Sequence, residues 1–219
     1  MIKAAIFDMD GTLLYTLSDL ARSVNHALAE LGLPERSLDE VRAGIGNGVG
    51  NLMRLALPQG ADEALCARAL ELFRAHYEKN SRVDTRPYPG IPQLLDSLRL
   101  AGVRTAIVSN KFDSAVKELN SLWFGVDVAI GESSLCRRKP APDMVLMALE
   151  ALELSPADCA YIGDSEVDYH TAVNSGCMPV MAGWGYRSRQ ELEALAEGLP
   201  IADTPEQVLS FLLPESPAL

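Results

Sequence analysis

The amino-acid sequence predicts an α/β protein: a Rossmann-like, doubly wound parallel sheet core with an inserted all-helical cap domain. After Pro89, short apolar runs with strand character alternate with segments of helical periodicity. This alternation is typical of right-handed crossovers and of a parallel sheet covered on both faces. Between Thr16 and Arg86, helical periodicity continues without a strand pattern. The first apolar run, Ala4–Phe7, precedes that interval and has the character of a buried strand ended by turn residues.

The segment after Pro89 predicts one continuous alternation of helices and strands. Its helices are expected at Ile91–Leu100, Asp113–Leu122, Met144–Leu154 and Val167–Asn174. Its strands are expected at Val103–Val108, Val126–Ile130, Cys159–Ile162 and Pro179–Ala182. A doubly wound sheet binds ligands outside the carboxyl ends of its strands. Asp8, Ser109 and Asp164 each follow a predicted strand, so we expect them to share one site.

The interval after the first strand predicts a small helical bundle. Apolar residues keep helical spacing over Leu17–Leu31, and Gly32 ends that helix. Ser37–Glu40 has the spacing of a capping box, and a long helix is expected at about Asp62–Lys79. The predicted domains are residues 1–16 and 87–219 for the Rossmann-like core and residues 17–86 for the helical cap.

Composition limits the classes of partner. The net charge of −11 argues against a nucleic-acid partner, because binding to a phosphate backbone needs a basic face. No apolar run reaches membrane-spanning length, and the N-terminus leads into a strand without a signal-peptide pattern. The four cysteines lack CxxC spacing, which favours buried thiols in a reducing compartment. We therefore expect a cytoplasmic protein without a membrane or nucleic-acid partner.

The segment from Asp8 to Thr12 carries the first candidate chemistry. Asp8 and Asp10 are two residues apart on an extended segment, so both carboxylates can reach one ligand. Like charges so close raise each other's pKa unless a cation neutralises them, and Mg²⁺ prefers oxygen ligands. Gly11 permits close approach of the backbone to a ligand, and Thr12 adds a hydroxyl group. Taken alone, the segment is equally consistent with a polar turn after a strand.

Three further segments extend the pattern. Ile107–Lys111 ends an apolar run with a hydroxyl and an amide, Arg137–Pro142 is a basic cluster with two prolines, and Tyr161–Asp168 ends a third run with acidic residues. With the first segment, and in this order, they resemble the four motifs of the haloacid dehalogenase superfamily of phosphotransferases. The resemblance covers the chain from Ala4 to Asp168 and is more specific than any one motif.

The resemblance implies a catalytic role for each motif. Asp8 is the nucleophile that forms an aspartyl-phosphate, and Asp10 protonates the leaving alcohol and then activates water. Mg²⁺ is held by the Asp8 carboxylate, the backbone carbonyl of Asp10 and the Asp164 carboxylate. Ser109 donates a hydrogen bond to the phosphoryl group, and Lys139 supplies positive charge to the transition state.

Other residues of these motifs are candidates for binding. Gly11, Thr12 and Asn110 are expected to contact the substrate. By resemblance, Asp168 orients either Lys139 or a metal-bound water, and the sequence leaves both roles open.

Structural roles compete with these catalytic ones. Asp164 and Asp168 are four residues apart and can also cap the following helix. Ser109 can also begin the next helix as its cap. Lys139 can also be a solvated surface lysine, although the flanking prolines argue against that role.

The glycine-rich segment Gly44–Gly50 is the candidate for substrate choice in the helical domain. It lacks both a preceding strand and the Gly-Lys-Ser/Thr ending of a P-loop, so a nucleotide cradle is not expected. By resemblance, the helical domain closes over the site as a lid, and Gly46, Asn47 and Gly48 would then face a small acidic substrate. The alternative is a flexible break between helices.

Several segments resemble one branch of the superfamily, the phosphoglycolate phosphatases. They are Ile45–Gly48, Tyr88–Ile91 and Ser109–Lys111. One position departs from the pattern, because Tyr15 and Thr16 stand where this family often has Asp-Ser or Asn-Thr. Tyr15 therefore lies where it can alter the pocket mouth at the cap hinge.

Rival reactions within the superfamily are distinguished by single residues. Haloalkanoate dehalogenases lack the second acid of the first motif, whereas Asp10 is present. Phosphonate hydrolases use a cap lysine, and the predicted cap offers only Lys79, near its end. Sugar phosphomutases usually carry an arginine–acid pair where this chain has Gly46–Gly48. Pyrophosphate and nucleotide phosphatases share the cap type and stay open.

The sequence therefore predicts a Mg²⁺-dependent phosphatase that hydrolyses a small phosphomonoester, 2-phosphoglycolate or a similar compound. A sugar phosphomutase or a pyrophosphate or nucleotide phosphatase is the alternative within the superfamily. A non-catalytic binding or regulatory protein on this fold is the alternative from another class, and the presence of all the catalytic carboxylates argues against it. We expect a monomer or a homodimer.

Overall fold

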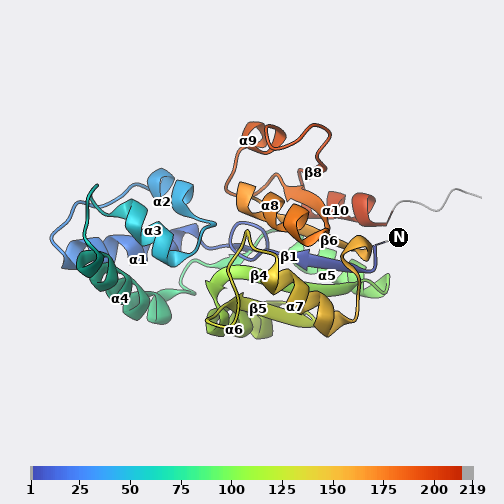
Figure 1. Cartoon of the computed structure of the whole chain (residues 1–219), viewed down its shortest axis with the longest axis horizontal. Helices are drawn as coiled ribbons and strands as arrows, with labels where there is room; N and C mark the ends of the chain where they lie inside the picture. The colour runs from blue at the N-terminus through green and yellow to red at the C-terminus, as the bar shows by residue number, and fades with distance from the viewer. Residues whose placement is uncertain (1, 214–219) are drawn as a thin grey trace, which may run out of the picture. The chain divides into compact units, whose positions relative to one another are not determined.

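The computed structural model describes residues 2–213, and its largest element is a six-stranded sheet (Figure 1). The strand order is β5-β4-β1-β6-β7-β8, and all of the pairings between these strands are parallel. The predicted α/β class with a doubly wound parallel sheet is confirmed. The strands are β1 (Ala4–Phe7), β4 (Arg104–Phe112), β5 (Val128–Glu132), β6 (Cys159–Gly163), β7 (Met178–Ala182) and β8 (Ile201–Ala202).

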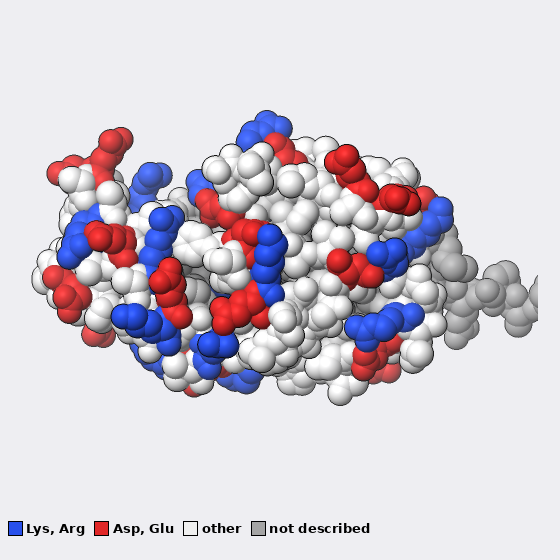
Figure 2. Space-filling model, turned by 90° about the horizontal axis from the view of Figure 1, so that it is seen from below, with Lys and Arg blue, Asp and Glu red and all other residues white. Residues whose placement is uncertain are grey.

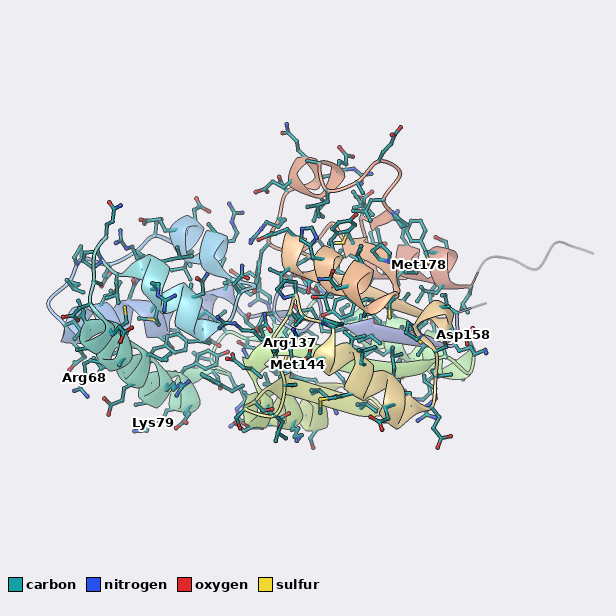
Figure 3. All side chains as sticks on the ribbon, in the orientation of Figure 1. Arg68, Lys79, Arg137, Met144, Asp158 and Met178 are labelled. Atoms are coloured by element: carbon teal, nitrogen blue, oxygen red, sulfur yellow. The ribbon has the colours of Figure 1, made fainter. Side chains whose placement is uncertain are left out.

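Helices cover both faces of this sheet. Helices α7 and α8 pack on one face around a fully buried cluster to which Met144, labelled in Figure 3, contributes. Helices α5 and α10 contact each other and cover the opposite face. The helices that accompany the sheet are α5 (Ile91–Leu100), α6 (Asp113–Trp123), α7 (Asp143–Leu152), α8 (Glu166–Ser175), α9 (Arg189–Glu193) and α10 (Pro205–Leu212).

The register of the three central strands defines one edge of the sheet. Phe7 of β1 lies beside Ile107 of β4 and beside Ile162 of β6. The residues that follow these positions therefore leave the sheet at a common edge, which is the carboxyl end of each strand. The chain also reverses its direction of winding at β1, and ligands bind at such a switch point.

Strand β4 is longer than the sequence predicts. The expected end was Val108, but the strand continues to Phe112 and pairs there with Glu132 of β5 after a shift of register. Ser109, Asn110 and Lys111 thus lie within an irregular strand, so the alternative in which Ser109 caps the next helix is wrong. A register shift changes the direction in which side chains point, and such irregularities are common next to binding sites.

The chain divides into two compact units, and the helical one is continuous in sequence. It comprises Leu14–Arg86, while the other unit contains the chain up to Leu13 and from Pro87 onward. The segments that connect them, β2 (Leu14–Tyr15) and β3 (Arg86–Pro87), pair as a two-stranded sheet. The sequence had set the first boundary between Thr16 and Leu17.

The helical unit contains four α-helices. Helix α1 packs on α4, and the rings of Phe73 and Tyr77 stack with centroids 5.3 Å apart. The predicted capping box is confirmed at the start of α2, where the Ser37 hydroxyl and the Glu40 carboxylate bond each other's backbone amides. The helices are α1 (Leu17–Glu30), α2 (Leu38–Gly44), α3 (Val49–Ala56) and α4 (Glu63–Asn80).

Charge is mixed on the surface that Figure 2 shows. Basic side chains lie among acidic ones on this face and form no broad basic field there. Within residues 2–213, no helix combines the length and apolar character that crossing a membrane would require. The four cysteines have free thiols.

Candidate active site

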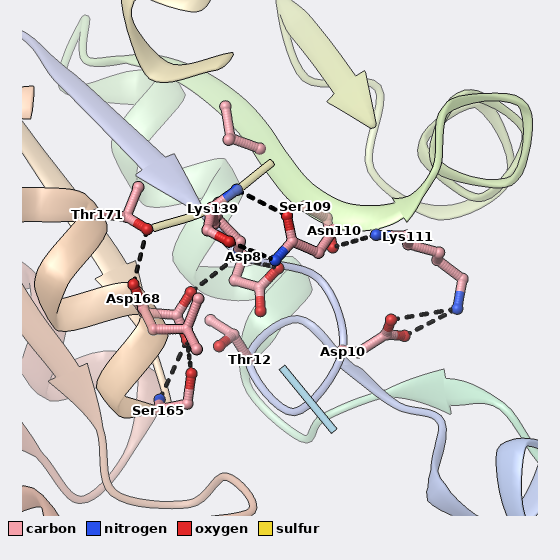
Figure 4. Close-up of polar contacts among 12 residues, drawn as sticks. Asp8, Asp10, Thr12, Ser109, Asn110, Lys111, Lys139, Ser165, Asp168 and Thr171 are labelled. Atoms are coloured by element: carbon pink, nitrogen blue, oxygen red, sulfur yellow. Dashed lines mark hydrogen bonds and ion pairs between the residues drawn. The ribbon is translucent and has the colours of Figure 1, made fainter. Parts of the chain in front are cut away.

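A cluster of three buried carboxylates lies at the carboxyl edge of the sheet. Figure 4 shows two of them, Asp8 and Asp168, with Lys139. Asp8 directly follows β1, Asp164 directly follows β6, and Asp168 comes from the first turn of α8. One carboxylate oxygen from each lies within 4.8 Å of the other two. Such a concentration of negative charge away from water requires compensation by cations or by protons.

Lys139 supplies one positive charge to this cluster. Its side chain is only 1% exposed, and its Nζ lies 2.7 Å from Oδ1 of Asp168 and 2.9 Å from Oδ1 of Asp8. It also donates to the Tyr161 hydroxyl at 2.9 Å. The surface-lysine alternative for Lys139 is therefore wrong.

Asn110 holds the backbone of Lys139 in place. Its side-chain amide donates to the Lys139 carbonyl at 3.0 Å, and its carbonyl oxygen accepts from the Lys139 amide at 2.8 Å. Asn110 thus joins β4 to the basic loop. These bonds give Asn110 a positioning role, and its predicted contact with the substrate stays a prediction.

The environment shifts the pKa values of the cluster. Burial raises the pKa of Asp8 from 3.8 to about 6, against the opposing effect of Lys139. Burial, reinforced by the charges of Asp168 and Asp8, also raises the pKa of Asp164. For Lys139, burial acts to lower the pKa, but Asp168 and Asp8 outweigh it, so the ammonium form is strongly favoured. One ammonium therefore does not fully compensate for three carboxylates.

Asp164 is held from two sides. The Thr12 hydroxyl donates to Oδ1 at 3.1 Å, and the backbone amide of Tyr186 donates to Oδ2 at 2.7 Å. Two glycines make room for the carboxylate, because a Cβ at Gly11 would lie 2.4 Å from its Oδ2 and a Cβ at Gly185 would lie 2.2 Å from its Cβ. Gly11 thus allows the backbone to approach Asp164 closely, and Thr12 orients the same carboxylate. The predicted contact of Gly11 and Thr12 with the substrate stays a prediction.

Asp168 both caps helix α8 and contacts Lys139. Its Oδ2 accepts from the Ser165 hydroxyl at 2.6 Å and from the Ser165 amide at 3.1 Å, which caps helix α8. Its Oδ1 meanwhile accepts from Lys139. Asp168 therefore orients Lys139, and the helix cap fixes the carboxylate that does so.

The Asp10 side chain pairs with Lys111 and does not belong to the three-carboxylate cluster. Lys111 Nζ donates to its two carboxylate oxygens at 2.9 and 3.3 Å (Figure 4). Among the residues described, the cluster of possible metal ligands consists of Asp8, Asp164 and Asp168 and does not include the Asp10 carboxylate. The Asp10 carboxylate therefore lies outside this group of oxygens, because β1 ends at Phe7 and a turn follows it. That both carboxylates of the first motif reach one ligand stays a prediction, as does the metal contact through the Asp10 backbone carbonyl.

Several contacts in this site had weak or no signals in the sequence. Lys111 comes two residues after Ser109 in a motif that the sequence singled out, yet its partner Asp10 is 101 positions away. Tyr161 begins the segment that ends in acidic residues, and its hydroxyl donates to the Val108 carbonyl at 2.9 Å. Tyr186 is 22 positions from Asp164, and its contribution is a backbone amide that no side-chain pattern marks.

Ser109 lies in β4, where its hydroxyl accepts from the Lys111 backbone amide at 3.4 Å. The remaining predicted residues lie in the helical unit. Gly46, Asn47 and Gly48 form the loop between α2 and α3, with positive φ angles of 117° and 78° at the two glycines. Tyr15 lies in β2, and its ring lies 4.7 Å from the Arg86 guanidinium carbon. Their relation to the carboxylate cluster stays a prediction.

The site fits a divalent cation. Oδ1 of Asp8 is buried and lacks a hydrogen-bond partner among the described residues, although the Lys139 ammonium lies 2.9 Å away as an ion pair. The cluster carries three carboxylates against one ammonium, so ionisation of all of them leaves two uncompensated negative charges. Carboxylate oxygens are the ligands that Mg²⁺ prefers.

Comparisons with known proteins agree with this geometry. Residues 5–182 match the family of haloacid dehalogenase-like hydrolases. The chain is 36% identical over 201 residues to a phosphoglycolate phosphatase of Nitrosospira multiformis, covering 89% of this chain and 88% of that protein. It is 35% identical over 188 residues to one of Aquifex aeolicus, with coverage of 84% and 86%. A crystal structure from Lactobacillus delbrueckii subsp. bulgaricus, provisionally named a phosphoglycolate phosphatase, has a TM-score of 0.91 at 35% identity, with coverage of 97% and 99%.

The chain therefore belongs to the haloacid dehalogenase-like hydrolases, as its four motifs predicted. Within that family it falls in the phosphoglycolate phosphatase-like branch, and it is an enzyme of the phosphomonoester hydrolase type.

Proposed function

We propose that the protein hydrolyses a small phosphomonoester with the help of Mg²⁺, with Asp8 as the nucleophile. The observation that carries this proposal is the state of the Asp8 carboxylate. It is buried at the carboxyl end of β1, its Oδ1 lacks a hydrogen bond, and Lys139 lies 2.9 Å from that oxygen. A carboxylate that is held by an ion pair but otherwise unsolvated is well suited to attack phosphorus.

The reaction divides into two displacements. In the first, an Asp8 oxygen bonds to phosphorus while the bond to the ester oxygen breaks, and Asp10 gives its proton to the departing alcohol. In the second, water attacks the aspartyl-phosphate, Asp10 takes a proton from that water, and inorganic phosphate leaves with Asp8 restored. Lys139 and Ser109 stabilise the negative charge that spreads over the phosphoryl oxygens.

Mg²⁺ would be held by the carboxylates of Asp8 and Asp164 and by the backbone carbonyl of Asp10. It would neutralise the charge shared by the phosphoryl group and the buried carboxylates. Thr12 and the Tyr186 amide support this role, because they orient the Asp164 carboxylate without using a positive charge.

For the substrate we propose 2-phosphoglycolate or a close analogue. The names of the relatives from Nitrosospira multiformis and Aquifex aeolicus support this choice. The helical unit would act as a lid, with Gly46, Asn47 and Gly48 near the part of the substrate that distinguishes one ester from another. We place the reaction in the cytoplasm, where the four cysteines would stay reduced.

Phosphate release from a panel of esters tests the proposal. The panel contains 2-phosphoglycolate, p-nitrophenyl phosphate, sugar phosphates, nucleotides and pyrophosphate, each with Mg²⁺ and with a chelator. We expect Mg²⁺-dependent release that is greatest for 2-phosphoglycolate and that falls by on the order of 10⁴-fold or more in Asp8→Asn. Substantial turnover in that variant would refute the role of Asp8, and release from none of the esters would favour a mutase or a binding protein.

A further inference from the structure

Lys111 is a buried cation that has no role in the mechanism proposed above. Lys111 comes from the irregular end of β4, and its side chain is 2% exposed. Its Nζ donates to the two oxygens of Asp10, whose side chain is 15% exposed. Burial of an ammonium is costly unless it is paired, so this lysine depends on an anionic partner.

The two buried lysines of the site contact different carboxylates. Lys139 contacts Asp8 and Asp168, whereas Lys111 contacts Asp10. In the proposed reaction Asp8 bonds to phosphorus, and Asp10 exchanges a proton with the ester oxygen. Lys139 thus lies beside the transferred phosphoryl group, while a group 2.9 Å from Asp10 lies beside the alcohol that leaves.

We propose that the Lys111 ammonium binds an anionic group on the alcohol part of the substrate and selects phosphomonoesters that carry a carboxylate close to the ester oxygen. This inference rests on the proposed function and adds to it the residue that recognises the leaving group. The carboxylate of the substrate joins or replaces Asp10 as the partner of Lys111, so the ammonium is paired both before and after binding. A neutral alcohol offers no such partner and gains nothing from Lys111.

The alternative to this proposal is a purely structural role, in which Lys111 only holds Asp10 in position. A structural role predicts that removal of the ammonium lowers the activity toward every substrate equally. Recognition of the leaving group predicts a loss that depends on the charge of the alcohol. The ratio of the activities toward a charged and a neutral alcohol therefore distinguishes the two roles, whereas the activity toward one substrate does not.

The test compares two esters that differ in the charge of a two-carbon alcohol, 2-phosphoglycolate and 2-hydroxyethyl phosphate. Lys111→Met removes the ammonium at similar length, and Lys111→Arg keeps a positive charge. We expect wild type to favour 2-phosphoglycolate in kcat/KM, and Lys111→Met to lower that preference by roughly 10- to 100-fold, chiefly through KM. Lys111→Arg should retain part of the preference. Lys117→Met is the matched control, because Lys117 is a 64% exposed lysine on α6 that pairs with Asp113.

A second measurement is independent of turnover. Calorimetric titration of 2-phosphoglycolate into Asp8→Asn, with and without Lys111→Met, measures binding alone, and we expect the double variant to bind more weakly by a similar factor. Thermal unfolding verifies that each variant is folded. Equal losses for both esters, or unchanged binding in the double variant, would overturn the role of Lys111 and leave the phosphatase intact. Absence of release from both esters by wild type would overturn the proposed function and this inference together.

Discussion

At the scale of single residues, the ionisation of Asp8 links metal binding to stability. Burial raises its pKa from 3.8 to about 6, so the folded, metal-free protein holds a proton on Asp8 more tightly than the unfolded chain does. This contribution to stability is complete below pH 4 and is lost as the pH rises through 6, and a pKa rise of this size corresponds to about 3 kcal/mol. Above pH 6, the ionised carboxylate destabilises the metal-free fold.

Asp8→Asn should therefore be more stable than wild type when Mg²⁺ is removed. We expect its free energy of unfolding at pH 8 in chelator to exceed that of wild type by up to about 3 kcal/mol, with the difference vanishing near pH 4. Added Mg²⁺ should reverse the order, because it stabilises the wild-type carboxylate. Denaturant titrations at both pH values measure this. Asp96→Asn, at a 69% exposed carboxylate on α5, is the control that should change little. A variant less stable than wild type at pH 8 would contradict the argument.

The residues that the sequence identified are those whose chemistry is marked locally. Asp8, Ser109 and Asp164 could be found because each follows an apolar run, and parallel strands bring such positions to one edge. The contacts of Lys111 and Tyr186 could not be predicted, because their partners lie far away along the chain. The positions of β4 and of the loop after β7 in the fold determine those contacts. Local patterns therefore predicted the residues at the strand ends, but not the distant partners of Lys111 and Tyr186.

At the scale of elements, the loop after β7 shapes the proposed metal site. Its backbone amide at Tyr186 bonds Asp164, and Trp184 donates from its indole to the Thr12 carbonyl at 3.0 Å. The same loop therefore contacts both the strand-end acid and the turn after β1. Its closeness to Asp164 depends on Gly185, where any Cβ would overlap that side chain.

Gly185→Ala should weaken Mg²⁺ binding without unfolding the protein. The new Cβ would lie 2.2 Å from the Asp164 Cβ, so the loop or the carboxylate must move. We expect the affinity for Mg²⁺ to fall by roughly 10- to 100-fold, as happens when supporting contacts of metal ligands are lost. Isothermal titration calorimetry without substrate measures it. Gly50→Ala in α3 is the matched control, since a Cβ there meets no atom within 4 Å. Equal affinities in the two variants would refute the role of the loop.

The loop between α2 and α3 carries a separate prediction about substrate choice. If Gly46, Asn47 and Gly48 face the substrate, then Asn47→Ala should alter the order of activity among phosphate esters and leave the dependence on Mg²⁺ unchanged. We expect the preference for 2-phosphoglycolate over p-nitrophenyl phosphate to change by roughly tenfold, the size of one hydrogen bond to a charged group. Rates over a series of Mg²⁺ concentrations for both esters measure this. An unchanged substrate profile would count against the role of this loop.

Most of the regular elements were predicted within a few residues, because their hydrophobic periodicity is set by burial against one sheet or one bundle. The exceptions have tertiary causes. Strand β4 extends to Phe112 because β5 pairs with it beyond the expected end. Helices α9 and α10 and strands β2, β3 and β8 were not predicted: α9 and the three strands are short, and the burial of α10 depends on contact with α5, which ends 105 positions before α10 begins. Such long-range contacts produce no hydrophobic periodicity in the local sequence.

At the scale of the whole molecule, every carboxylate of the candidate metal site belongs to the unit that contains the sheet. A ligand stabilises the part of a protein whose unfolding would abolish its site, by about 2.7 kcal/mol at 100 times its dissociation constant. Binding of Mg²⁺ alone should therefore stabilise the sheet unit and leave the four helices of Leu14–Arg86 with their intrinsic stability.

Hydrogen exchange can resolve this difference along the chain. Without substrate, we expect Mg²⁺ to slow amide exchange at the carboxyl ends of β1 and β6, at the start of α8 and in residues 183–187, since these segments hold the carboxylate ligands or bond them. Exchange within α1–α4 should stay the same. Asp164→Asn should abolish the protection while keeping the fold, which separates metal binding from general effects of salt. Protection spread equally over both units, or retained in Asp164→Asn, would show that Mg²⁺ acts elsewhere than at this carboxylate cluster.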